Sequence, residues 1–288
     1  MHEKTINTDF YWERGYCQIR PIRRGFLEDV SQAAETFDQI IRNPVNGPFV
    51  QGFGNKDGKF RQLRYLHYRT DAFRRLMQSE EIRAITRCVF GSRRMFVTHS
   101  KVSHKEFGHE LEWFPHQDSA YKLLHNLPAR DGMTIAVFLE DADERSGTIQ
   151  VFPGSHKLRT LPHSLQQPEH EGGSGQLVVQ VLPNIEAESV IAKKGDILVF
   201  TFDTIHQSQP NQSHGYRPVF LFEIKPHKGF PLDERGLPPI IINGKLAPAV
   251  RVIYPLVATI RRFRVVVEKS RLATRLRMGL ARLRPGGF

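Results

Sequence analysis

The feature that most constrains the fold is a succession of short strand-type runs in the middle of the chain. Each run is rich in apolar and β-branched residues, and Gly, Pro and Asp stand between the runs. Many short strands of this kind are typical of a β-sandwich or a β-barrel. We therefore predict a mainly β protein, with strands at residues 95–105, 133–140, 148–152, 176–182, 189–191, 196–202 and 219–225.

The N-terminal third of the chain has a different pattern. Residues 15–22 are predicted to form one strand, and residues 25–42 place apolar side chains at helical spacing. Residues 43–58 are rich in Gly and Pro and are expected to form a loop. A second helix is expected over residues 71–89, ending before Gly91. These flanking helices are predicted to brace a sheet.

A His-x-Asp motif is the first candidate for a metal site. On an extended strand alternate side chains share a face, so His116 and Asp118 would point the same way, about 6 to 7 Å apart. An imidazole and a carboxylate, completed by a second imidazole, form the facial triad that holds Fe(II) and leaves positions open for chemistry. A rival pair, His104 and Glu106, has no partner motif downstream, so we assign it a structural or substrate-facing role.

The second imidazole is expected from a segment 90 residues downstream. Gly195 and Asp196 turn the chain into an apolar strand that delivers His206 just past its end, and Arg217 leads the next apolar strand. A His and an Arg so placed can face one cavity, where the guanidinium suits a carboxylate held in bidentate fashion. Taken singly, each of these residues is better explained as a surface or core residue than as part of a metal site. Their joint order favours a metal site.

Three motifs in this order resemble one known family. They are HQD at residues 116–118, GTIQVFPGSHK at residues 147–157, and the segment that holds His206, Ser208 and Arg217. Together they resemble the phytanoyl-CoA dioxygenase family of Fe(II)- and 2-oxoglutarate-dependent oxygenases, from Phe96 to Ile224. The approach KVSHKEFGHELEWFPHQD at residues 101–118 is more similar to the bacterial and fungal biosynthetic branch than to the lipid-degrading one.

The resemblance implies a double-stranded β-helix, that is, a jelly-roll or cupin-like core, in which two metal-bearing strands meet at one open end. It implies that His116, Asp118 and His206 bind Fe(II) as the catalytic ligands. Halogenating relatives need a small residue in place of the carboxylate, so Asp118 favours oxygen chemistry over halogenation. His156, in the PGSHK turn, is expected to shape the pocket rim without binding metal.

The resemblance also implies two co-substrates, 2-oxoglutarate and O2, and the release of succinate and CO2. Arg217, 11 residues after His206, and Ser208 would hold the far carboxylate of 2-oxoglutarate. Thr134 and Lys101 fall at further co-substrate contact positions, although a solvated lysine at a strand edge explains Lys101 equally well.

The expected organisation is one oxygenase domain followed by a basic extension. Residues 1–250 form the domain, with a helical flank at 1–93 and a jelly-roll core at 94–228, and residues 251–288 form a basic amphipathic C-terminal helix. Residues 162–175 are polar and Gly-rich, which is typical of a mobile loop. By position that loop resembles the family's active-site lid, and an ordinary solvent loop is the alternative.

Composition sets the cellular setting that we expect. With 40% apolar and 25% charged residues, the chain is neither fibrous nor disordered. Two cysteines exclude a disulfide framework and a cysteine-type zinc site. We find neither a signal peptide nor an apolar run long enough to span a membrane. These features predict a soluble, cytoplasmic protein.

The net charge of +11 is concentrated at the C-terminus. Residues 251–288 hold ten Arg and Lys against Glu268 alone, and leucines gather on one arc of the predicted helix. One interpretation is peripheral contact between residues 255–284 and an anionic membrane at its inner face. The other is docking of the leucines on the catalytic domain. Nucleic-acid binding is not expected, because the helix lacks stacking aromatics.

The first functional hypothesis is an oxygenase that hydroxylates, or otherwise oxidises, a small organic substrate such as a biosynthetic intermediate or a lipid or glycolipid headgroup. The alternative is a non-catalytic jelly-roll binding module attached to a membrane or an acidic partner by its basic tail. Desaturation, cyclisation and epimerisation use the same kind of centre, and the oligomeric state is left open. Side chains expected to select the substrate are His104, Glu112, Trp113, Tyr121 and Phe220.

Overall fold

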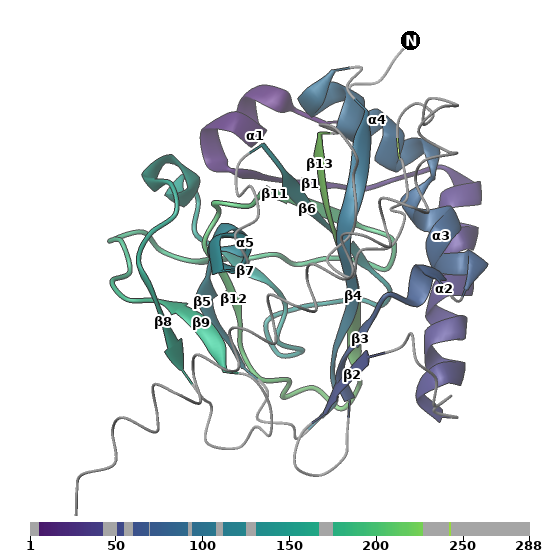
Figure 1. Cartoon of the computed structure of the whole chain (residues 1–288). Helices are drawn as coiled ribbons and strands as arrows, with labels where there is room; N and C mark the ends of the chain where they lie inside the picture. Colours follow the sequence, from purple (N-terminus) through teal and green to yellow (C-terminus); the bar gives the residue numbers. More distant parts are fainter. Residues whose placement is uncertain are drawn as a thin grey trace, which may run out of the picture.

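Two antiparallel β-sheets face each other, and helices cover the outer face of the larger sheet (Figure 1). The structure is a computed structural model of the chain. It describes residues 6–42, 51–54, 60–68, 70–91, 94–107, 112–124, 131–166 and 175–226, together with residue 242. The predicted C-terminal helix lies outside the described residues.

The larger sheet has seven strands in the order β1-β11-β6-β13-β4-β3-β2. Several neighbours in this order, such as β1 and β11, are far apart in the sequence, so the sheet joins N-terminal residues to the centre of the chain. The strands are β1 (Tyr16–Ile19), β2 (Gln51–Gly54), β3 (Phe60–Arg64), β4 (Met95–Lys105), β6 (Met133–Phe138), β11 (Ile197–Thr201) and β13 (Arg217–Pro226).

The smaller sheet has four short strands in the order β10-β7-β12-β5. Its strands are β5 (Trp113–His116), β7 (Gln150–Val151), β10 (Glu188–Ser189) and β12 (His206–Ser208). A separate antiparallel pair, β8 (His163–Gln166) and β9 (Gln176–Val179), lies beside β5. The two facing antiparallel sheets are the predicted jelly roll.

The large sheet is buried on both faces, which explains its continuous apolar runs. Side chains on β13 alternate: Phe220 and Phe222 join the core beneath the helices, whereas Val219 and Leu221 join the core between the two sheets. Every residue of β6 and β11 is buried. Residues on the inner face of this sheet therefore face the interior of the jelly roll.

The helices of the N-terminal flank pack on the outer face of the large sheet (Figure 1). They are α1 (Thr8–Arg14), α2 (Arg24–Arg42), α3 (Asp71–Met77) and α4 (Glu80–Phe90), with a short 3₁₀ turn η1 (Leu66–Tyr68) before α3. The single helix predicted over 71–89 is two helices. The hydroxyl of Ser79 accepts from Ile82 N, so this residue caps α4 and separates it from α3.

Three sequence interpretations need correction. The loop predicted at residues 43–58 includes β2, and the helical flank predicted at residues 1–93 contributes β2 and β3 to the large sheet. The strand predicted at residues 15–22 is confirmed as β1. The lid or loop predicted at residues 162–175 begins as β8, which pairs with β9. Turn-rich composition does not reveal such strands, because their pairing partners lie elsewhere in the chain.

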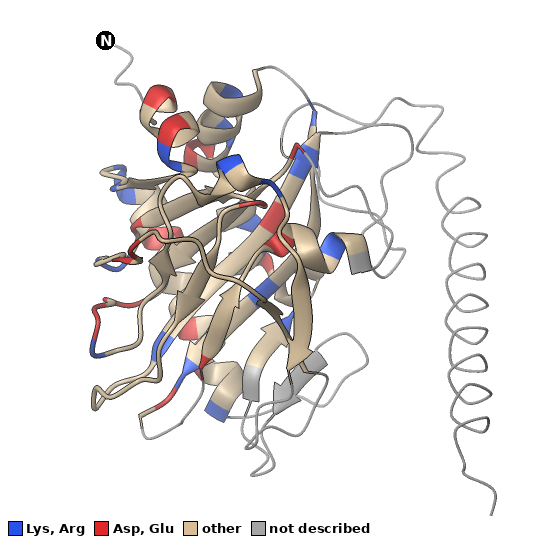
Figure 2. Cartoon of the chain, turned by 90° about the vertical axis from the view of Figure 1, so that its left-hand side faces the viewer, with Lys and Arg blue, Asp and Glu red and all other residues tan. Residues whose placement is uncertain are grey.

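No helix within the described residues is long and apolar enough to cross a bilayer. Lys, Arg, Asp and Glu positions are interspersed over the described elements (Figure 2).

Candidate metal centre

A cross-strand pair brings the two predicted histidine ligands together. His116 ends β5, His206 begins β12, and the two residues lie directly opposite each other in the antiparallel ladder. Their ring centroids are 4.2 Å apart. Backbone pairing within one sheet therefore closes the gap of 90 positions between them.

The secondary structure at Asp118 differs from the predicted strand. Asp118 does not lie on a strand, because β5 ends at His116 and Asp118 begins the short helix α5 (Asp118–Leu124). Between these two residues, the side-chain Nε2 of Gln117 donates to the backbone carbonyl oxygens of Arg159 and Asp203. These contacts hold Gln117 and fix the turn, so that both flanking side chains point inward.

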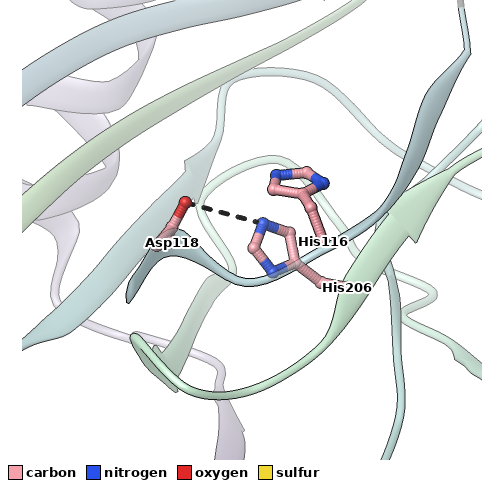
Figure 3. Close-up of side chains that lie close together, drawn as sticks. All are labelled: His116, Asp118 and His206. Carbon is pink, nitrogen blue, oxygen red and sulfur yellow. Dashed lines mark ion pairs between the residues drawn. The ribbon is translucent and has the colours of Figure 1, made fainter. Parts of the chain in front are cut away.

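The three side chains converge on one point (Figure 3). One potential ligand atom from each of His116, Asp118 and His206 lies within 4.8 Å of the others, and all three residues are buried. His206 Nε2 lies 3.9 Å from Asp118 Oδ1. This is the only such cluster of metal-binding side chains within the described part of the chain. His156 lies outside it, as predicted, and its Nε2 is 3.0 Å from the Trp12 carbonyl oxygen.

Hydrogen bonds to the backbone orient both imidazole rings. His116 Nδ1 lies 2.6 Å from Phe114 O, and His206 Nδ1 lies 3.1 Å from Thr204 O. A carbonyl oxygen only accepts, so each Nδ1 carries the proton and donates it. Each Nε2 then keeps its lone pair, which is the arrangement that a metal-binding histidine requires.

The electrostatics of the cluster produce the charge state that a metal needs. Burial, with the neighbouring His206, lowers the pKa of His116 to about 3, and burial also lowers the pKa of His206. Burial alone would raise the pKa of Asp118, but attraction to His206 and Lys101 outweighs it and lowers that pKa to about 2. At neutral pH the cluster is thus one carboxylate and two neutral imidazoles. These residues fit Fe(II).

Thr134 has a contact that the sequence did not predict. Its hydroxyl donates to Asp118 Oδ2, while Oδ1 is the oxygen near His206. One carboxylate oxygen is thus held by the protein and the other faces the ligand cluster. Thr134 orients the carboxylate from the neighbouring strand β6.

Arg217 and Ser208 lie in the same interior, further along the strands. Ser208 is buried two residues after His206, and Arg217 is buried at the start of β13. The guanidinium donates to Gly147 O at 2.6 Å, and its Nε has no hydrogen-bond partner. Burial lowers its pKa to about 10, so the group is still charged at neutral pH. A buried guanidinium with an unpaired N–H fits the carboxylate of a co-substrate such as 2-oxoglutarate.

Gly147 makes this arrangement sterically feasible. Its φ of 66° lies in the left-handed region, and a Cβ there would collide with the Gln209 carbonyl oxygen. The turn can therefore approach the end of β12 closely and present its own carbonyl oxygen to Arg217.

Lys101 lies on β4 opposite Leu221, on the inner face of the sheet. Its positive charge acts on all three ligands, since it lowers the pKa of both histidines and of Asp118. Its Nζ is 5.8 Å from the centroid of the Trp113 ring. Lys101 therefore faces the candidate metal centre.

Sequence reasoning missed two buried lysines. Lys105 is fully buried beside Arg217 and its Nζ donates to Ser208 O at 2.9 Å. Lys122, on α5, forms a buried ion pair with Glu223 on β13. For Lys105, the signal in the sequence was a second lysine four residues after Lys101, on the same face of strand β4. For Lys122, the signal was the single carboxylate, Glu223, within the apolar run of β13.

The residues expected to select the substrate do not all lie near the candidate metal centre. Tyr121 is near the centre, since its ring is 5.7 Å from the His116 ring. Phe220 and His104 instead contact Phe73 and Phe37 of the helical layer, at 4.7 and 5.6 Å between ring centroids. A substrate-facing role for Phe220 and His104 is therefore wrong, and the structural alternative for His104 holds. Glu112 O accepts from the Gln176 amide, which ties β9 to β5.

Comparison with known proteins agrees with this geometry. The family model for phytanoyl-CoA dioxygenase (PhyH) matches residues 11–219. The Stutzerimonas stutzeri protein named "Probable alpha-ketoglutarate-dependent hypophosphite dioxygenase" is 26% identical over 230 residues, covering 77% of this chain and 78% of that protein. The peroxisomal phytanoyl-CoA dioxygenase of Mus musculus is 25% identical over 72% of this chain, and only 64% of its own length is covered.

Solved structures share the fold. EctD from S. alaskensis, crystallised with 2-oxoglutarate and 5-hydroxyectoine, has a TM-score of 0.62 at 14% identity, covering 78% of each chain. The epimerase SnoN, in complex with Fe3+, alpha ketoglutarate and nogalamycin RO, has a TM-score of 0.58 at 16% identity, covering 83% of this chain and 94% of its own.

Proposed function

Because the chain belongs to the phytanoyl-CoA dioxygenase family, we propose that it oxidises an unactivated C–H bond of a small organic substrate at the His116–Asp118–His206 centre. Its activity class is that of a 2-oxoglutarate-dependent non-haem iron dioxygenase. In hydroxylation, one atom of O2 enters the C–H bond of the substrate. The other atom enters the succinate formed as 2-oxoglutarate loses CO2.

The observation that carries the proposal is the convergence of two imidazoles and one carboxylate, whose potential ligand atoms lie within 4.8 Å of one another. Bound iron supplies the oxidising chemistry that no side chain can perform. The protein supplies two neutral imidazoles whose Nε2 atoms face inward and one carboxylate whose free oxygen faces them. His116, Asp118 and His206 would hold the metal, and co-substrate and substrate would use the coordination positions that these three residues leave open.

The proposed co-substrate site uses Arg217, Ser208, Thr134 and Lys101. Arg217 is a buried cation with an unpaired Nε, and Ser208 adds a hydroxyl on the strand that carries His206. Lys101 places positive charge beside the centre, where it favours a second carboxylate. Thr134 keeps Asp118 in place from β6. These cations and hydroxyls suit a dicarboxylate.

The presence of Asp118 supports hydroxylation over halogenation as the outcome. The relatives that it matches carry dioxygenase names, and their substrates are as different as hypophosphite and phytanoyl-CoA. We therefore expect a small-molecule substrate, either a biosynthetic intermediate or a lipid or glycolipid headgroup. The intact ligand cluster speaks against the binding-module alternative.

The direct test is turnover of 2-oxoglutarate by the full-length protein. With Fe(II) and ascorbate in air, the wild-type protein should form succinate slowly without added substrate, and faster with extracts that contain the substrate. His206→Ala should form none, because the cross-strand imidazole is lost. Succinate formation at equal rates in both proteins would refute the proposed function.

We further propose that the basic C-terminal extension contacts an anionic membrane, which would place a cytoplasmic protein at the inner face of the bilayer. Its ten cations and its arc of leucines support this proposal. Full-length protein should co-sediment with phosphatidylserine-containing vesicles, and a truncation after Glu268 should bind them less while keeping its turnover. Absence of vesicle binding by the full-length protein would contradict the proposal.

A further inference from the structure

The inner face of the large sheet has two unlike halves. Over β6, β11 and β13 most inward side chains are apolar and belong to one buried cluster, which includes Ala136, Leu198 and Leu221. Over β3 and β4 the inward positions are polar or cationic, as the register with β13 shows: Gln62, Arg64, His99, Lys101, Ser103 and Lys105. The second half is a wall suited to polar ligands.

The middle of this polar wall of β3 and β4 faces the three candidate metal ligands. Lys101 lies between Leu221 on β13 and Arg64 on β3, so all three side chains share one face of the sheet. Lys101 Nζ lies 5.8 Å from the centroid of the Trp113 ring, and Trp113 begins β5, the strand that ends at His116, so this row faces the strand that carries the first candidate ligand. Arg64 is thus one strand beyond Lys101 on the side that the centre occupies.

Arg64 is held in a fixed orientation. The Gln62 amide oxygen accepts from Arg64 Nε at 3.4 Å and from Nη2 at 3.3 Å. Gln62 is only 2% exposed, whereas Arg64 is half-buried. A half-buried guanidinium on a rigid strand, oriented by a buried amide, is prepared for planar recognition of an oxyanion.

Arg64 lies away from the Arg217 end of the proposed co-substrate site. Along β4, Lys101 pairs with Leu221 and Lys105 pairs with Arg217, so four residues separate the two levels. Four residues of strand span about 13 Å. Arg64 therefore lies at the Lys101 level and two strands away from β13, which is remote from the carboxylate position proposed at Arg217.

We propose that Arg64, oriented by Gln62 and next to Lys101, binds an oxyanion group of the substrate. The proposal rests on the proposed function and adds the substrate class: a small organic anion, with a carboxylate or a phosphorus oxyanion at one end and the oxidised C–H bond at the other. Both headgroups offer the two oxygens that a guanidinium fork binds.

The test is calorimetric titration of full-length protein loaded with Zn(II), as a redox-inert metal, and saturating 2-oxoglutarate. The probes are butanoate and propylphosphonate, with butanamide as the uncharged match. Wild type should bind at least one anion and not the amide, and the stronger anion identifies the headgroup. Arg64→Met should weaken that binding by about tenfold or more, and Arg64→Lys, which keeps the charge but loses the fork, should weaken it less.

Two controls locate the effect. Arg24→Met removes an exposed arginine from α2 and should leave anion binding unchanged. The affinity for 2-oxoglutarate, titrated separately, should be the same in Arg64→Met as in wild type. Equal loss of 2-oxoglutarate binding would assign Arg64 to the co-substrate, and wild-type protein that binds neither anion would equally overturn the proposal. Wild-type protein that neither binds 2-oxoglutarate nor forms succinate would instead refute the proposed function.

Discussion

Between β6 and β11 on one side and β7 and β10 on the other, the interior of the jelly roll is filled with aliphatic and aromatic side chains. Near β4, β5 and β12 it holds the three candidate metal ligands and several buried charges. The first region stabilises the fold, since each buried apolar Å² contributes about 25 cal/mol. The second costs stability, because charges lose their hydration on burial. We therefore expect each buried charge in the second region either to pair with a neighbouring protein group or to bind a ligand.

The charged and the apolar regions should therefore respond differently to substitution. In the charged region, a change should alter chemistry more than folding where a ligand is lost, and folding where one member of an ion pair is left alone. In the apolar region, a change should alter folding alone. Four predictions follow this contrast, from the largest effect to the smallest.

Replacing the carboxylate ligand should have the largest effect. Asp118→Ala removes the only anion of the cluster, so succinate formation should fall by about a thousandfold or more, equivalent to about 4 kcal/mol. Initial rates at saturating 2-oxoglutarate and Fe(II) measure it. Asp141→Ala, which removes an exposed carboxylate, is the control and should leave the rate unchanged. Normal turnover by Asp118→Ala would remove Asp118 from the metal site.

The buried ion pair should have the next effect. Lys122→Met leaves Glu223 buried without its cation, so the free energy of unfolding should fall by about 3–5 kcal/mol. Chemical denaturation measures the change. In the double variant Lys122→Met/Glu223→Leu most of the loss should be recovered, because the isolated charge is gone. A double variant as unstable as the single one would show that the pair itself stabilises the fold.

The apolar region should respond in stability alone. Leu198→Ala empties a fully buried site between the sheets and should lower the free energy of unfolding by about 3 kcal/mol. Turnover per folded molecule should be preserved. Leu165→Ala, at a side chain that is 63% exposed, is the matched control and should change stability by less than about 0.5 kcal/mol. Loss of turnover in folded Leu198→Ala would contradict the prediction that a change in the apolar region alters stability alone.

Acid should weaken the metal-free protein through its buried imidazoles. The pKa of His116 is lowered from 6.5 to about 3 on folding, so below pH 6.5 the unfolded state binds a proton that the folded state does not. The free energy of unfolding should therefore fall with pH from 6.5 downward, by about 1.4 kcal/mol per pH unit from this group. His206 acts in the same direction. Between pH 5 and 7, the free energy of unfolding should depend less steeply on pH in His116→Gln than in the wild type. An equally steep dependence in the variant would contradict this prediction.

The sequence was sufficient to predict the parts of the fold that depend on local pattern. Residues 25–42 carry helical spacing and form α2, and the apolar runs at residues 133–140 and 196–202 contain β6 and β11. The pairing of His116 with His206 could be predicted only through the family resemblance, because periodicity does not say which strands meet. The structure brings the three predicted ligand residues together, although the strand assumed for Asp118 was wrong.

Features that depend on distant contacts were beyond the sequence. The orientation of Asp118 depends on Gln117, whose side chain bonds to carbonyl oxygens 42 and 86 positions away. The Lys122–Glu223 pair joins a short helix to a strand about one hundred positions away. The lone carboxylate in the apolar run of β13 indicates a buried charge but does not identify its partner, so only the folded arrangement shows that the two residues meet.

The most direct test of the central claim is anaerobic titration of the protein with Fe(II) and 2-oxoglutarate, followed by the weak visible charge-transfer band of the bound pair. We expect the band in wild type, and a requirement for about tenfold or more 2-oxoglutarate in Arg217→Ala, since the variant loses a charge-assisted hydrogen bond. A folded wild-type protein that develops no band, or a variant that needs no more 2-oxoglutarate than wild type, would contradict the account.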